Sequence, residues 1–270
     1  NLLRVPSLVF AVNKLDAVED PALAFAHIRA ALEKFAAAAR IAVRATVPVS
    51  ALKGFNVVDA TPGWCGYEGP SLLQILELLP NTPADVALPV AFPVQWVEKF
   101  SDSAETQQGR RVYWGRVAAG TARIGQPIAV LPSGQQAVIA QVLDHVRQPH
   151  DVAAGQSAGI VLDHEVDISR GDWLLAPQGY EPSRTLRATV AWLDDQPLVP
   201  GRVYWALHGH RWVKAKVQRI VHRLDVHTLE RQDATELPAN AIVEIELALQ
   251  ENLATRPYAQ SRALGSLVLV

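Results

Sequence analysis

The residues best suited to chemistry lie in Asn13-Lys14-Leu15-Asp16, directly after the apolar run Ser7–Val12. An ionised aspartate presents two acceptor oxygens, which suit the adjacent N–H donors on the Watson–Crick edge of guanine and would face an acceptor on adenine. The Asn13 amide can bond another polar edge of the base or tie neighbouring loops together, and the Lys14 stem can lie along the purine. The tetrad therefore predicts a guanine site, although Asn and Asp are also common in ordinary strand-to-helix turns.

A second motif, Ser50-Ala51-Leu52, follows the apolar run Val47–Val49. Its small side chains allow backbone N–H groups to approach a base carbonyl. A helix-sized segment separates the two motifs, so both loops should emerge at the same edge of a parallel sheet, where ligands of open α/β folds bind. The predicted nucleotide-binding residues are Asn13, Lys14, Asp16, Ser50, Ala51 and Leu52.

The segments around these motifs predict a β-α-β unit. A helix capped by Asp20 should run to about Arg40, and a strand should follow at residues 44–49. A second helix at residues 71–79 and several prolines then mark the first domain boundary. On the long helix we expect the sheet-facing stripe to consist of Phe25, Ile28, Leu32 and Phe35.

From Val90 onward the apolar pattern changes from helical to alternating. Short, regularly spaced strands with glycine-bearing turns are typical of closed antiparallel barrels. We expect the last strand at residues 265–270. His208 and His210 flank a glycine turn, where two imidazoles can bind a metal, but no third ligand with suitable spacing follows and a plain polar turn is favoured. The predicted domains are residues 1–84, a nucleotide-binding α/β region, and two β-barrels at 89–183 and 184–270.

Composition narrows the class of protein. The net charge of −2 and the pI near 6.5 give no electrostatic case for a nucleic-acid partner or an anionic membrane. Cys65 is the only cysteine, which excludes an internal disulfide and a cysteine-rich zinc site and fits a reducing, cytoplasmic setting. No apolar run reaches the roughly 18 residues that a membrane span requires. The chain contains no methionine and begins close to a buried strand, so we expect it to be a piece of a longer protein.

The two guanine motifs resemble those of translation-factor GTPases, Asn-Lys-x-Asp and Ser-Ala-Leu/Lys. Segments of the last β region are similar to the GTPase large subunit of bacterial ATP sulfurylase (sulfate adenylyltransferase), namely Pro197–Arg202, His222–Glu230 and Pro257–Leu267. This resemblance covers essentially the entire chain. It implies an elongation-factor-like fold, in which the C-terminal half of a P-loop GTPase domain precedes two antiparallel β-barrels.

The resemblance also implies an activity. GTP and magnesium would be the cofactors, and GTP hydrolysis would drive a smaller catalytic subunit that joins ATP and sulfate into adenylyl sulfate and pyrophosphate. Two departures from the family pattern matter. The phosphate loop Gly-x-x-x-x-Gly-Lys-Ser/Thr and the Asp-x-x-Gly element are absent from these residues, and Phe55 stands where the family usually has an acidic residue. This stretch alone should therefore not hydrolyse GTP, and no catalytic residue or metal ligand is predicted within it.

Two alternatives stay open. The first is an elongation-factor-type GTPase that binds aminoacyl-tRNA, which shares the three-domain plan. The charge balance speaks against it, because a tRNA partner requires cations to meet its phosphates. The second is a non-enzymatic module of two barrels that binds a partner.

Overall fold

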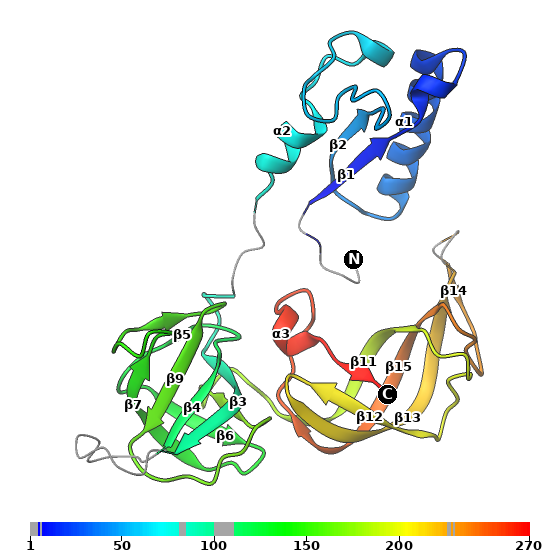
Figure 1. Cartoon of the computed structure of the whole chain (residues 1–270). Helices are drawn as coiled ribbons and strands as arrows, with labels where there is room; N and C mark the ends of the chain where they lie inside the picture. Colours follow the sequence, from blue (N-terminus) through cyan, green and yellow to red (C-terminus); the bar gives the residue numbers. More distant parts are fainter. Residues whose placement is uncertain (1–4, 6, 81–84, 100–110, 226–227, 229) are drawn as a thin grey trace. The chain divides into compact units, whose positions relative to one another are not determined.

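The computed structural model describes residues 5, 7–80, 85–99, 111–225, 228 and 230–270, and the chain divides into two compact units, residues 1–83 and 84–270 (Figure 1). Each unit is treated by itself below. No helix in the described ranges is both long enough and apolar enough to span a membrane. The predicted boundary at residue 84 falls within segment 81–84, which lies outside the described residues.

The first unit is built on two parallel strands joined by a long helix. Its elements are β1 (Leu8–Val12), η1 (Leu15–Ala17), α1 (Pro21–Ala38), β2 (Val43–Pro48), η2 (Trp64–Gly66) and α2 (Leu72–Glu77). Val12 lies opposite Pro48 in the parallel register. Helix α1 begins where the Asp20 carboxylate accepts a hydrogen bond from the Leu23 N–H at 2.9 Å, with proline in the first turn. The predicted β-α-β unit is present.

The buried face of α1 differs from the predicted stripe. Phe25 is buried in a core with Val12 and Leu15, whereas Ile28 and Phe35 are 40% and 43% exposed. Leu32 is partly buried and Ala36 is buried, so the contact line runs through Phe25, Leu32 and Ala36 instead. The line is rotated because α1 packs against η1 and η2 as well as β2.

The second unit begins with a closed antiparallel barrel. Its ring order is β10-β3-β4-β9-β7-β6, and β5 and β8 form a separate pair. A single core of alternating inward residues fills it, including Phe92, Tyr113 and Ile160. The strands are β3 (Ala91–Lys99), β4 (Arg111–Arg116), β5 (Thr121–Ala122), β6 (Pro127–Leu131), β7 (Gln136–Leu143), β8 (Val152–Ala153), β9 (Ser157–Leu162) and β10 (Trp173–Leu175).

A six-stranded sheet, called here the second sheet, follows the barrel. Its order is β11-β15-β13-β12-β16, with β14 paired to β13, and within the described residues this path does not join β11 to β16. Its own core contains Trp192, Val213 and Ile245. The predicted strand at 265–270 is shorter, because the α3 turn occupies its first residue. The elements are β11 (Ser183–Trp192), β12 (Val203–His208), β13 (Arg211–Leu224), β14 (Arg231–Gln232), β15 (Ala241–Leu253), α3 (Arg262–Gly265) and β16 (Val268–Leu269).

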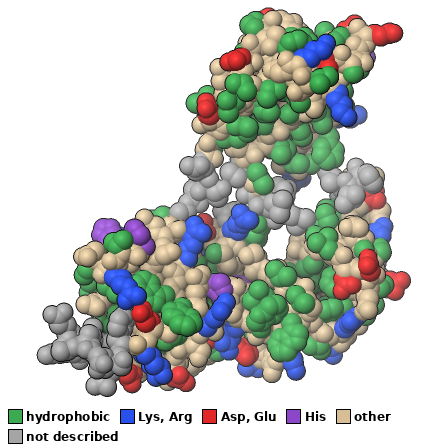
Figure 2. All heavy atoms as spheres, in the orientation of Figure 1, with side chains coloured by type: hydrophobic (Ala, Val, Ile, Leu, Met, Phe, Trp, Pro, Cys, Tyr) green, Lys and Arg blue, Asp and Glu red, His purple; other side chains and the backbone are tan. Residues whose placement is uncertain are grey.

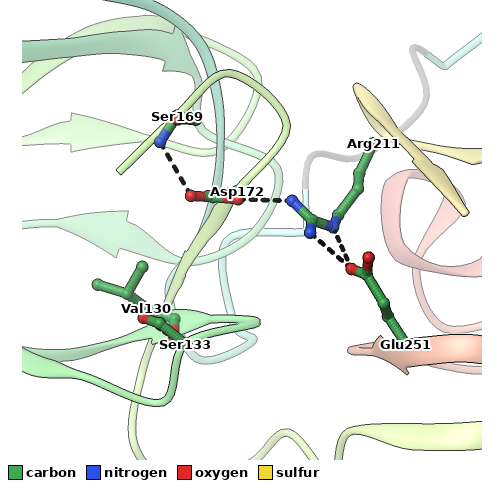
Figure 3. Close-up of polar contacts among 6 residues, drawn as sticks. All are labelled: Val130, Ser133, Ser169, Asp172, Arg211 and Glu251. Atoms are coloured by element: carbon green, nitrogen blue, oxygen red, sulfur yellow. Dashed lines mark hydrogen bonds and ion pairs between the residues drawn. The ribbon is translucent and has the colours of Figure 1, made fainter. Parts of the chain in front are cut away.

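A charged cluster joins the barrel to the second sheet (Figure 3). Arg211 donates from Nη1 to Asp172 Oδ1 at 2.7 Å and from Nε and Nη2 to Glu251 Oε2 at 2.8 and 2.5 Å. The Asp172 side chain is only 10% exposed, and its other oxygen accepts a hydrogen bond from the Ser169 N–H at 2.9 Å. The guanidinium therefore bridges carboxylates from both sheets in one place.

The two histidines of the β12–β13 turn also lie at this joint, and they point to different partners. His208 is buried, places Nε2 3.1 Å from the Leu264 carbonyl oxygen and stacks on Trp173 at 5.1 Å between ring centroids. His210 Nε2 lies 2.9 Å from Gln95 Nε2. Within the described residues no group of three or more His, Cys, Asp or Glu side chains could hold a metal ion.

Candidate guanine-nucleotide site

The two predicted loops lie side by side at the carboxyl ends of β1 and β2. The Val49 N–H donates to the Val12 carbonyl at 2.8 Å, which extends the pairing one step beyond the strands. Asn13 Oδ1 then accepts hydrogen bonds from the Lys14 N–H at 2.8 Å and the Ala51 N–H at 3.1 Å. One amide oxygen thus holds both motifs together across 38 residues of sequence.

The turn after β1 sets the position of the carboxylate. Lys14 has a left-handed backbone (φ 65°, ψ 20°), which bends the chain from β1 into η1. Leu15 is 2% exposed and anchors this turn in the core beside Phe25. Asp16 is half-buried, and its carboxylate has no hydrogen bond or ion pair to another described residue. Both of its acceptor oxygens are therefore available to a ligand.

The Ser50 loop is a compact turn with a buried base. Ser50 is fully buried, its Oγ accepts a hydrogen bond from the Lys53 N–H at 3.1 Å, and its carbonyl accepts one from the Gly54 N–H at 2.8 Å. Ala51 and Leu52 are exposed, Leu52 by 87%. The Ala51 N–H, expected to face a base carbonyl, instead bonds Asn13, so of the two roles open to Asn13 the loop-tying one is the role observed.

Asn56 is a positioning residue that the sequence analysis did not single out. It is fully buried with φ 52°, donates from Nδ2 to the Pro48 carbonyl at 3.1 Å, and accepts a hydrogen bond at Oδ1 from the Thr61 N–H at 2.6 Å. It thereby fixes the end of β2 to the loop that follows the motif. An asparagine two residues after Gly54, in a loop between predicted elements, is the available signal, since asparagine tolerates positive φ and bonds local backbone.

Phe55, the residue that departs from the family pattern, has a packing role. Its ring lies 5.1 Å from the ring of Trp64, centroid to centroid, and it pairs with Ser50 through an isolated β-bridge. The Phe55 ring thus packs against a neighbouring aromatic side chain. The loop keeps its contact with Ser50.

The polar groups of the two loops fit a purine base but not the phosphates of a nucleotide. A free carboxylate, an exposed lysine stem and two loops bound through one amide can recognise a planar base with adjacent N–H donors. The sequence of 270 residues holds no glycine-rich phosphate loop with its lysine and hydroxyl, so these residues supply neither a triphosphate cradle nor the hydroxyl that would bind magnesium.

Comparison with known proteins identifies relatives along the full chain. The "GTP-eEF1A C-terminal domain-like" family model matches residues 185–270. The "Bifunctional enzyme CysN/CysC" of Xylella fastidiosa is 38% identical over 272 residues, which cover 100% of this chain and 42% of that protein. Sulfate adenylyltransferase subunit 1 of Laribacter hongkongensis is 36% identical over 273 residues, and that of Salmonella typhi 34% over 272 residues; each match covers 100% of this chain and 55% of the relative. The chain thus spans about half the length of these relatives.

Among solved structures, Sup35 in complex with GMPPNP is similar with a TM-score of 0.61 at 20% sequence identity, over 97% of this chain and 66% of that one. Sup35 in complex with GDP gives a TM-score of 0.60 over 99% of this chain and 67% of that one. At this identity the likeness concerns the fold, and it confirms the predicted fold class. The predicted resemblance in sequence is confirmed by the relatives.

Proposed function

Because the chain is homologous over its whole length to sulfate adenylyltransferase subunit 1, we propose that the intact protein is the GTP-binding and GTP-hydrolysing subunit of a sulfate adenylyltransferase. GTP and water would give GDP and phosphate, and this hydrolysis would drive a smaller catalytic subunit that converts ATP and sulfate into adenylyl sulfate and pyrophosphate. The observation that carries the proposal in this chain is the Asn13 bond to the Ser50 loop, which aligns both guanine motifs. The match to these relatives along the whole of this chain favours this function over aminoacyl-tRNA delivery.

Within this proposal each residue has a role. Asp16 accepts the adjacent N–H groups of guanine, Lys14 covers one face of the base, and Asn13 holds the second loop in place. Ala51 and Leu52, which are exposed, form the wall on the other side, and the buried Ser50 holds their loop in shape. Magnesium and the phosphates would be held by residues outside this chain, and the setting would be cytoplasmic. The division of the chain after residue 83 supports a first domain at 1–84. Separate cores in the barrel and in the second sheet support two further domains at 89–183 and 184–270.

Replacement of Asp16 by asparagine tests the base reader. In the intact protein, Asp16→Asn should lower GTP affinity about 10- to 100-fold, because hydrogen bonds to a charged group contribute roughly 1.5–3 kcal/mol. It should raise the affinity for XTP, since the asparagine amide can donate to the additional carbonyl of xanthine. Competition between the two nucleotides measures the shift.

Glu19→Gln is the matched control, because Glu19 is an exposed carboxylate three residues away. It should leave the preference unchanged. An unaltered preference in Asp16→Asn would remove Asp16 from the site. A second test uses residues 1–270 alone, which should release no phosphate from GTP above background; magnesium-dependent turnover would contradict the assignment of phosphate binding to residues outside the chain.

A further inference from the structure

The outward side of the second sheet carries an apolar surface, called here the aromatic face. Figure 2 shows hydrophobic side chains gathered over β12 on this part of the molecule. Trp205 and Trp212 are 48% and 50% exposed, and Val270 is 68% exposed. The members of the aromatic face are Val203, Trp205, Leu207, Trp212, Val268 and Val270, with Lys214 and Lys216 at its edge.

Strand register makes this surface continuous. Leu207 lies opposite Trp212 of β13 on one side and Val268 of β16 on the other. Trp205 lies opposite Lys214 and, on its other side, exchanges two backbone hydrogen bonds with Val270 at 2.9 and 2.8 Å. Directly opposite residues project from the same side of a sheet. Three adjacent strands therefore present their apolar side chains together.

The other half of the same outward surface is built differently. There Arg219 bonds both oxygens of Glu246 at 2.6 and 2.7 Å, Glu244 forms an ion pair with Arg187, and Nε2 of His222 lies 3.3 Å from Glu244 Oε2. Such ion pairs leave a polar surface suited to water. On the aromatic face, neither lysine has a carboxylate partner among the described residues, and the Lys214 Nζ lies 5.6 Å from the centroid of the Trp205 ring.

The chemistry of this face matches a protein interface. Two half-exposed tryptophans offer about 100 Å² each, taken from the roughly 150–250 Å² of an aromatic side chain. Monomeric proteins rarely expose contiguous apolar patches beyond a few hundred Å², and larger ones mark interaction sites. Tryptophan is enriched at the centres of interfaces, with a polar rim around them.

Lys214 and Lys216, which meet no carboxylate in the part of the chain that the structure describes, indicate which partner fits. In a two-fold dimer whose axis passes through this face, the lysines of one copy would lie close to those of the other, and like charges at an interface are unfavourable. A nucleic acid would require a track of cations along its backbone, whereas here two lysines border an apolar centre. We propose that the aromatic face binds a protein surface that is apolar at its centre and acidic at its edge. Resting on the proposed function, that partner is the smaller catalytic subunit.

The test measures binding of the intact protein to the purified small subunit of the same organism by interferometry at two salt concentrations. Trp205→Ala and Trp212→Ala should each weaken binding about thirtyfold or more, as central interface tryptophans do. Reversal of the rim charge, Lys214→Glu with Lys216→Glu, should lower the association rate and its salt dependence, because rim charges steer encounter. Trp96→Ala is the matched control, since Trp96 is 64% exposed on β3, and it should bind as the parent does.

Several outcomes overturn the inference. Binding within twofold of the parent in the double tryptophan variant would do so, as would a parent protein that does not bind the small subunit. Loss of self-association or of tRNA binding in the tryptophan variants, with small-subunit binding intact, would assign the face to another occupant. Guanine-nucleotide affinity is measured on the same samples. If the parent protein binds GTP but not the small subunit, the proposed role of the aromatic face is refuted. If the parent protein shows no preference for guanine nucleotides, the proposed nucleotide function is refuted instead.

Discussion

Replacement of Arg211 by methionine should destabilise the unit that holds residues 84–270 by about 3 kcal/mol, which is the lower end of the destabilisation expected when one partner of a buried ion pair is removed. The lower end applies because the Arg211 side chain is 23% exposed. The change removes the bond to Asp172 at 2.7 Å and both bonds to Glu251. Asp172, 10% exposed, would keep the Ser169 N–H as its remaining partner.

The loss should depend on pH in a defined direction. Burial raises the pKa of the Asp172 carboxyl, while the Ser169 hydrogen bond and the Arg211 charge oppose that rise. Without the guanidinium the pKa of the folded state rises further above that of the unfolded chain. Stability is then lost as pH rises through the folded pKa, so the variant should be more impaired at pH 8 than at pH 5.

Urea unfolding followed by tryptophan fluorescence measures the effect, and a thermal scan should show a fall in Tm of about 6–12 °C, taking roughly 2–4 °C per kcal/mol for 150–250 residues. Arg219→Met is the matched control, since Arg219 makes two bonds to Glu246 but is 60% exposed. It should cost far less. The double variant Arg211→Met with Asp172→Asn should recover part of the loss, because the unpaired buried charge is gone.

Equal destabilisation by Arg211→Met and Arg219→Met would refute the reasoning. So would a double variant no more stable than Arg211→Met alone, because the orphaned Asp172 carboxylate would then not be the source of the cost.

Three further predictions concern other parts of the chain. Gly209→Ala should lower the free energy of unfolding by roughly 2 kcal/mol or more, measured in a thermal scan, since φ is +60° and a Cβ would lie 2.6 Å from a Trp173 ring carbon. Gly201→Ala, at φ +88° with open space around it, should lower the free energy of unfolding by less. Burial lowers the pKa of His208, so stability should fall as pH drops below about 6.5, where the unfolded chain protonates first, and His208→Gln should flatten that slope in urea titrations at pH 5–7.5. Asn13→Ala should weaken GTP binding to the intact protein, measured by fluorescent-nucleotide titration, because the loops lose their shared acceptor; unchanged affinity would contradict that role.

The sequence predicts the elements well where side-chain period is the deciding signal. Residues 21–38 show a helical period and a capping aspartate, and the strands of the barrel alternate between glycine-bearing turns. Ile28 and Phe35 were wrongly placed on the buried face, because the neighbours of a helix decide which side of a broad apolar stripe is covered. The α3 turn was missed for a similar reason: an apolar segment of a few residues can be strand or turn.

The candidate site could be predicted in its residue types but only partly in its contacts. Asn13 had two possible partners, and the choice between them depends on the spacing of two loops that sequence alone does not give. The Arg211 cluster was missed because its two carboxylate partners lie 39 and 40 residues away and nothing local marks them. Pairings over such distances follow from how the sheets pack, which local pattern does not encode.

The ring closure of the barrel has a consequence for how the chain acquires its fold. Strand β10 pairs with both β3 and β6, with Trp173 opposite Pro93 and Leu131, so one late, short strand completes the cylinder. At a synthesis rate of about 5–20 residues per second, the interval between positions 93 and 173 lasts roughly 4–16 s. The β3 edge is unpaired throughout that interval, and the β6 edge is unpaired for its last 42 residues, roughly 2–8 s. A ribosome stalled at this stage would present an aggregation-prone intermediate.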